Sequence, residues 1–151
     1  MIYNFSSPAK INLGLEVLNK RDDNFHNIKT IFQFLDWGDE ISLDTNTEET
    51  KIICSDLPQE ENIIHKLLSI LAEKYVFTKK IKIEVKKKIP FESGLGGASS
   101  NAASVLLALN KIFKLELKSK ELFRIALSLG SDVPVFTVSY THLTLPTTQV
   151  V

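Results

Sequence analysis

A glycine-rich segment at residues 94–101, with the sequence GLGGASSN, contains the residue types that most directly suggest a chemical role. Three of its first four residues are glycine, so the backbone can adopt positive φ angles and approach a ligand closely. A helix that begins there would present free N–H groups and the positive end of its dipole, which together suit a phosphate group. Ser99 and Ser100 could cap that helix or contact a phosphate or its metal ion. The alternative interpretation is a tight turn between a strand and a helix with an ordinary serine cap.

The spacing of this segment separates it from two well-known phosphate loops. No Lys-Ser or Lys-Thr pair follows its last glycine, so it is not a Walker A motif. The glycines are also too closely spaced for the dinucleotide fingerprint. Local chemistry therefore predicts a phosphate site without naming its class.

Charged and polar residues elsewhere could complete a site. Lys10 and Asn12 share one face of a predicted strand, so both could line one pocket. Asp132 follows Gly130, and its carboxylate could either orient a reacting hydroxyl or accept hydrogen bonds from nearby backbone N–H groups. No cluster of His and Cys has the spacing of metal ligands.

The periodicity of apolar residues predicts the elements that must position these groups. Alternation and β-branched residues predict strands at residues 11–17, 28–37, 40–44, 51–54, 80–86 and 133–138. Helical spacing predicts one helix after Asn62 as N-cap, one from Ser99, and one from Ser119 to Gly130. Strands first, then helices mixed with single strands, predict an α+β fold.

The bulk composition limits the class of protein. The 151 residues are 44% apolar and 24% charged, with a formal net charge of zero, as expected for one soluble domain. We expect no nucleic-acid partner, because a nucleic-acid binder carries a basic excess, and no membrane partner or signal peptide. Cys54 is the single cysteine, which fits a cytoplasmic protein.

The sequence PFESGLGGASS at residues 90–100 resembles the ATP motif of the GHMP kinase superfamily. Within that superfamily, further segments are similar to those of the 4-diphosphocytidyl-2-C-methyl-D-erythritol kinases: SPAKINL at residues 7–13, RDDNFH at 21–26, TIFQFLD at 30–36 and GSDVPVF at 130–136. Matches in the same order along the chain are more specific than any one of them alone.

The resemblance implies a GHMP-kinase N-terminal domain over residues 1–138, with a mixed or antiparallel sheet packed with helices. It implies that ATP and Mg²⁺ are cofactors, and that the 2-hydroxyl of the cytidine-diphosphate-linked methylerythritol is phosphorylated in non-mevalonate isoprenoid synthesis. The alternatives are another GHMP kinase, such as homoserine kinase, or a truncated nucleotide-binding fragment without turnover. Residues 139–151 are Thr-rich and resemble nothing in the family, so we expect a non-native tail and no C-terminal GHMP domain. Oligomeric state is not predicted.

The resemblance also assigns roles to individual residues. Lys10 and Asp132 would be catalytic, and Asn12, Phe25 and His26 would bind the substrate. The ATP-binding residues would be Pro90, Gly94, Leu95, Gly96, Gly97, Ala98, Ser99 and Ser100. Any Mg²⁺ would arrive with ATP and lie near Ser99 or Ser100. Three positions depart from the usual small or glycine residues of the family, namely Asn24, Ser93 and Ala98.

Overall fold

The computed structural model describes residues 1–24, 26–54 and 62–139, and it has an α+β fold, as predicted. The strands are β1 (Ile2–Lys20), β2 (His26–Asp44), β3 (Lys51–Cys54) and β4 (Lys82–Lys86). The helices are α1 (Ile63–Tyr75), α2 (Gly97–Ile112), α3 (Ser119–Leu129) and α4 (Val133–Ser139). The sheet order is β1-β2-β4-β3, with β3 parallel to β4 and the other pairs antiparallel, so the sheet is mixed.

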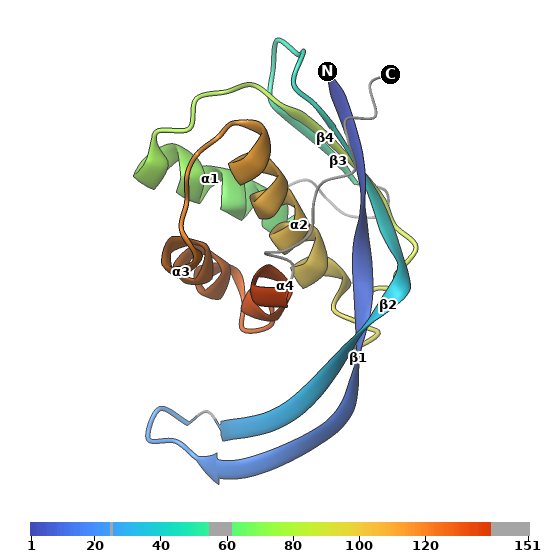
Figure 1. Cartoon of the computed structure of the whole chain (residues 1–151), viewed down its shortest axis with the longest axis vertical. Helices are drawn as coiled ribbons and strands as arrows, with labels where there is room; N and C mark the ends of the chain where they lie inside the picture. The colour runs from blue at the N-terminus through green and yellow to red at the C-terminus, as the bar shows by residue number, and fades with distance from the viewer. Residues whose placement is uncertain (25, 55–61, 140–151) are drawn as a thin grey trace.

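The described helices cover one face of the sheet (Figure 1). Alternation along the strands turns Phe5, Leu43 and Ile83 into the core, where each is buried. Helix α2 is central, because it contacts β1, β2 and each of the other helices. Its inner positions include Ala102, Ala103, Val105, Leu106, Ala108 and Leu109, all buried. No helix in the described part of the chain is both long and apolar enough to cross a membrane.

Strands β1 and β2 form one long hairpin that extends beyond the helices and curves at its far end (Figure 1). The sequence predicted two strands separated at Gly38, whereas β2 is continuous from His26 to Asp44. The backbone of Ser7 in β1 lies so close to Gly38 that a Cβ there would collide with the Ser7 carbonyl oxygen, so this position of the continuous strand requires glycine. The register shifts between Pro8 and Lys10, which bends the hairpin next to the glycine segment.

The turn at the tip of the hairpin keeps the geometry that glycine would give. Asn24 lies in this turn with a φ of 69°, in the left-handed region that glycine adopts without strain. Its N–H group donates to the carbonyl oxygen of Arg21 at 3.1 Å. Asn tolerates this left-handed conformation better than most residues, so the turn forms without glycine.

The predicted helix starts are correct to within two residues. Asn62 caps α1, since its side chain accepts a hydrogen bond from the Ile64 N–H at 2.9 Å. Helix α2 starts at Gly97 rather than Ser99. Helix α3 starts at Ser119, but its N-cap is Lys118 rather than the serine.

The predicted strand at residues 133–138 is wrong, because Val133–Ser139 is helix α4. Helical spacing buries Val133, Phe136 and Thr137 together, and α4 packs against α2 and α3. Pro134 fits because the first turn of a helix needs no N–H group from it. Packing therefore overrides the strand preference of the valines. The predicted boundary at residue 138 falls within α4, and residues 140–151 lie outside the described residues, so the tail stays a prediction.

Candidate functional site

The glycine segment forms a loop that joins β4 to α2. Gly94 and Gly96 have φ angles of 76° and 75°, the left-handed region that glycine adopts without strain. Gly96 is the N-cap of α2, so it has no side chain to bond the first turn, and that turn carries no acidic residue. The N-terminus of α2 therefore has the free N–H groups and positive dipole end that favour an anion.

Gly96 is also packed too closely for any side chain. A Cβ there would lie 2.9 Å from Cζ of Phe136 and 3.2 Å from Cε of Lys10. Phe136 is 1% exposed and packs against Phe34 of β2, with the two ring centroids 5.4 Å apart and the ring planes tilted by 51°. The loop therefore packs directly against Phe136 of α4 and the side chain of Lys10, and these contacts set its position relative to the core.

Lys10 connects β1 directly to the loop. Its backbone N–H donates to the carbonyl oxygen of Leu95 at 2.9 Å, and its Nζ donates to the carbonyl oxygen of Gly94 at 3.0 Å. The residue is only 4% exposed, so it is not an ordinary solvated strand lysine. Its Nζ also lies 3.4 Å from Oδ1 of Asn12 and 5.5 Å from the ring centroid of Phe32. The predicted shared face of Lys10 and Asn12 is thus confirmed.

A hollow of about 260 Å³ lies over this loop. Its lining includes most of the residues predicted to act together, namely Lys10, Pro90, Gly94, Gly96, Gly97, Ala98, Ser99 and Asp132. Asp132 is exposed, in the turn between α3 and α4. Among the described residues it forms no ion pair with Lys10, although both face the same hollow. The structure therefore brings the predicted catalytic pair to one site without direct contact.

The other predicted site residues are Leu95, Ser100, His26 and Phe25. Leu95 contributes its carbonyl oxygen to Lys10. Ser100 is fully buried, and its Oγ accepts a hydrogen bond from Ser7 Oγ at 2.9 Å, so it supports the loop from below. His26 pairs with Lys20 at the far end of the hairpin, and Phe25 lies outside the described residues.

A buried polar network beneath the loop was not predicted from the sequence. Its centre is Asp39 of β2, whose side chain is completely buried. Oδ1 accepts hydrogen bonds from the backbone N–H groups of Lys88 at 2.6 Å and Ile89 at 2.9 Å. Oδ2 accepts from Nδ2 of Asn101 at 3.0 Å and forms an ion pair with Nζ of Lys87. The network therefore joins β2 to both ends of the loop.

Hydrogen bonding keeps Asp39 charged despite its burial. Burial alone would raise the pKa of the carboxyl group, because it removes the charged form from water. The hydrogen bonds from Ile89, Lys87, Lys88 and Asn101 outweigh that effect and hold the pKa of Asp39 below its ordinary value. The carboxylate and the Lys87 ammonium thus form a compensated charge pair.

One signal in the sequence could have identified Lys87. Ile81, Ile83 and Val85 point inward at alternate positions, and the same alternation assigns Lys87 to the inner face. The run of three lysines at residues 86–88, taken by itself, is instead typical of a solvated strand end. Asp39 offered no such signal, because nothing local distinguishes it from a turn residue after Gly38.

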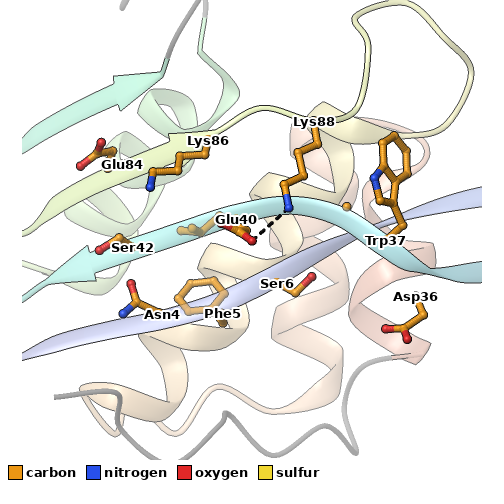
Figure 2. A pocket seen from close by; sticks show the side chains of 12 residues that line it. Asn4, Phe5, Ser6, Asp36, Trp37, Glu40, Ser42, Glu84, Lys86 and Lys88 are labelled. Atoms are coloured by element: carbon orange, nitrogen blue, oxygen red, sulfur yellow. Dashed lines mark hydrogen bonds and ion pairs between the residues drawn. The ribbon is translucent and has the colours of Figure 1, made fainter. Parts of the chain in front are cut away.

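A larger hollow of about 750 Å³ lies on the sheet face turned away from the helices (Figure 2). Lys86 and Lys88 extend over it, and Lys88 pairs with Glu40 at 3.0 Å. Asp36 and Glu84 also line it, so its charges are mixed. The described residues that line it include neither a helix N-terminus nor a glycine loop, and we therefore place the candidate site at the smaller hollow.

Comparison with known proteins gives the family. The GHMP kinases N terminal domain matches residues 62–140, which include the glycine loop and Asp132 and make up more than half of the chain. The chain belongs to the GHMP kinases. This membership is consistent with a mixed sheet packed with helices and with a glycine loop that leads into α2.

Individual relatives of this GHMP kinase chain point in the same direction. A protein of Actinobacillus pleuropneumoniae serotype 5b (strain L20) named 4-diphosphocytidyl-2-C-methyl-D-erythritol kinase is 43% identical, over 86% of this chain and 47% of its own length. A crystal structure of 4-(cytidine 5'-diphospho)-2C-methyl-D-erythritol kinase aligns with a TM-score of 0.76 at 33% identity, over 90% of this chain and 49% of that one. Homoserine kinase from Cytophaga hutchinsonii aligns with a TM-score of 0.58 at 21% identity, over 85% of this chain and 40% of that one, which shows a shared fold alone. The chain spans about half the length of these relatives.

Proposed function

We propose that the hollow over the glycine loop binds ATP. We further propose that the protein transfers the terminal phosphoryl group to the 2-hydroxyl of 4-diphosphocytidyl-2-C-methyl-D-erythritol, a step of non-mevalonate isoprenoid synthesis. The observation that carries the proposal is the convergence of Lys10, the glycine loop and Asp132 on one hollow. The names of the relatives supply the substrate, and the substrate stays a proposal because the chain spans about half of their length.

The proposed mechanism relies on position and charge more than on covalent chemistry. In phosphoryl transfer the new bond joins the substrate oxygen to the terminal phosphorus, while the bond from that phosphorus to the bridging oxygen of ADP breaks. Asp132 would accept the proton of the attacking hydroxyl, a role that suits its exposed position at the edge of the hollow. The N-terminus of α2 and the loop N–H groups would hold the phosphates.

Lys10 would stabilise the negative charge that develops during transfer. Its ammonium group is held by the carbonyl oxygen of Gly94 and lies on the hollow, so little side-chain entropy remains to be lost when the nucleotide binds. A fixed cation in a partly dry site stabilises a developing anion more strongly than one in water. Lys10 therefore acts by position, whereas Asp132 acts by accepting a proton.

The site fits a Mg²⁺ ion that arrives with ATP better than one held by the protein alone. No group of three or more His, Cys, Asp or Glu side chains in the described ranges could hold a metal ion. Mg²⁺ binds through phosphates, waters and only one or two protein oxygens, and it would neutralise phosphate charge when bound. Ser99 lines the hollow, whereas Ser100 is buried below it, so Ser99 is the better protein ligand of the two.

Substrate recognition in this proposal depends on the hairpin. His26 and Phe25 would contact the cytosine, the first through its two ring nitrogens and the second by stacking on the base. Asn12 lies beside Lys10 on the same strand and would hydrogen-bond the substrate near the reacting hydroxyl.

A coupled assay of ADP release tests this function. We would measure this chain alone and the same chain joined to the C-terminal half of the Actinobacillus relative, with ATP, Mg²⁺ and the cytidine-linked substrate. We expect turnover in the joined protein and none when homoserine replaces that substrate. Turnover with homoserine would favour a different GHMP kinase. No turnover in either protein, with ATP binding intact, would leave a nucleotide-binding fragment and contradict the proposed reaction.

A further inference from the structure

Three consecutive lysines at residues 86–88 point to opposite faces of the sheet. Lys86 and Lys88 lie over the outer hollow, where the side chain of Lys88 is 48% exposed (Figure 2). The side chain of Lys87 is only 7% exposed and lines the hollow at the glycine loop. The same residue type in adjacent positions thus has two different environments.

Two neighbours hold the Lys87 ammonium group in place. It forms an ion pair with Asp39 Oδ2 and donates to Oδ1 of Asn101 at 3.1 Å. An ammonium group has three N–H donors, so these two partners leave one donor for another acceptor. The ring centroid of Phe91 lies 5.4 Å from Nζ and contributes a cation–π contact rather than an acceptor atom.

The position of Nζ places that remaining donor at the start of α2. A Cβ on Gly97, the first residue of the helix, would lie 3.1 Å from Nζ of Lys87. The absence of a side chain at Gly97 therefore leaves room for the lysine beside the free N–H groups of the first turn. Gly97 and Ser99 line the same hollow as Lys87.

We propose that Lys87 is a phosphate-binding residue of the nucleotide site and that Asp39 is the positioning residue that holds it there. The inference rests on the proposed function, because it assumes that the hollow takes a nucleoside polyphosphate. Burying a lysine costs free energy unless an anion compensates it, and Asp39 supplies that compensation before any ligand is bound. The ligand therefore meets a cation that is already oriented. Lys87 and Lys10 line the hollow together, so the phosphates would contact two fixed cations.

Calorimetric titration with ATP, ADP and AMP tests this role. Loss of a phosphate contact should weaken binding more for nucleotides with more phosphate groups, whereas loss of a purely structural contact should weaken the binding of all three alike. We would compare the parent chain with the double variant Asp39→Asn/Lys87→Met, which removes both charges and leaves neither unpaired. We expect the affinity for ATP to fall about tenfold or more, as for loss of a hydrogen bond to a charged group, and the affinity for AMP to fall much less. Lys88→Met is the matched control, and its ATP affinity should equal that of the parent.

The outcomes separate this inference from the proposed function. If the parent chain binds none of the three nucleotides, both fail. Suppose instead that the parent binds ATP. If the double variant then loses affinity for ATP and AMP by the same factor, or keeps its affinity for both, the phosphate contact of Lys87 is refuted and the ATP site stands.

A measurement on the unsubstituted chain covers the case in which the double variant does not fold. With ¹⁵N-labelled lysine, the Nζ resonance of Lys87 should shift on addition of ATP and not on addition of adenosine; Lys87→Arg identifies that resonance. An unchanged Nζ resonance at saturating ATP would overturn the inference.

Discussion

Replacement of Gly96 by alanine should destabilise the protein more than the same replacement at Gly94. Gly96 and Gly94 have almost the same φ, 75° and 76°, so the left-handed backbone should cost each alanine variant the same, about 1–2 kcal/mol of folded-state stability. Alanine also lowers the conformational entropy of the unfolded chain, which offsets about 0.4–1 kcal/mol of that cost in both variants. The variants differ in space, because a Cβ at Gly94 meets nothing within 4 Å, whereas one at Gly96 meets Phe136 at 2.9 Å.

The space term can be estimated from the packing of the neighbours. Phe136 is buried against Phe34 and cannot rotate into solvent, so the loop or α4 must move. Overpacking of this kind costs about 1–3 kcal/mol. Gly94→Ala should therefore lower the free energy of unfolding by about 1 kcal/mol, and Gly96→Ala by about 2–4 kcal/mol.

Urea unfolding provides the measurement. Trp37 is the single tryptophan of the chain and lies at 43% exposure on β2, so its fluorescence reports on the sheet. The transition midpoints of the two variants and the parent give the difference in stability if the urea dependence is unchanged. Equal losses for Gly96→Ala and Gly94→Ala would refute the packing argument and leave only the backbone term.

Three other changes test separate parts of the structure. Asp132→Asn in the protein joined to the relative's C-terminal half should abolish ADP release while leaving the calorimetric ATP affinity unchanged, because the carboxylate is needed only to accept the proton; unchanged turnover would remove it from the mechanism. The folded state holds the pKa of Asp39 below the ordinary 3.8, so the contribution of its carboxylate to stability is complete above pH 3.8 and is lost as the pH falls through the lower, folded value. Below pH 3.8 the free energy of unfolding of Asp39→Asn should therefore depend less on pH than that of the parent. Parallel pH curves of unfolding free energy for the variant and the parent would contradict this. Asn62→Ala removes the side chain that accepts a hydrogen bond from the Ile64 N–H group, so the free energy of unfolding in urea should fall by about 1 kcal/mol with no change in ATP affinity. An unchanged free energy of unfolding would mean that water replaces the cap.

The local features of the site could be predicted because they depend on neighbours in the sequence. The glycines before α2, the Asn62 cap and the alternation at Lys10 each follow from backbone geometry over a few residues. The left-handed conformation of Asn24 is likewise a local matter, because asparagine tolerates it better than most residues. For these positions residue type and spacing determine the structure almost alone.

The features that depend on distant partners were missed or misassigned. The composition of residues 133–138 suits a strand, but as helix α4 this segment packs against α2 and α3 and buries Val133 and Phe136. The burial of the Lys87 ammonium group is compensated by the Asp39 carboxylate, and the burial of Asp39 is compensated in turn by Lys87. Neither residue explains the other until the chain has folded, so a search for local patterns could not identify the pair.

The buried network around Asp39 has a consequence for the order of events in folding. Its partners are far apart in the sequence: Asp39 is 48 residues from Lys87 and 62 from Asn101, and Ser7 is 94 residues from Asn101. Contacts with such separations form slowly, because closing the long intervening loops costs chain entropy before the contacts stabilise the structure. The glycine loop, anchored by these contacts, thus acquires its final shape only when β1, β2, β4 and α2 have assembled. In a refolding experiment, recovery of ATP affinity should therefore coincide with the slowest structural phase and lag behind helix formation.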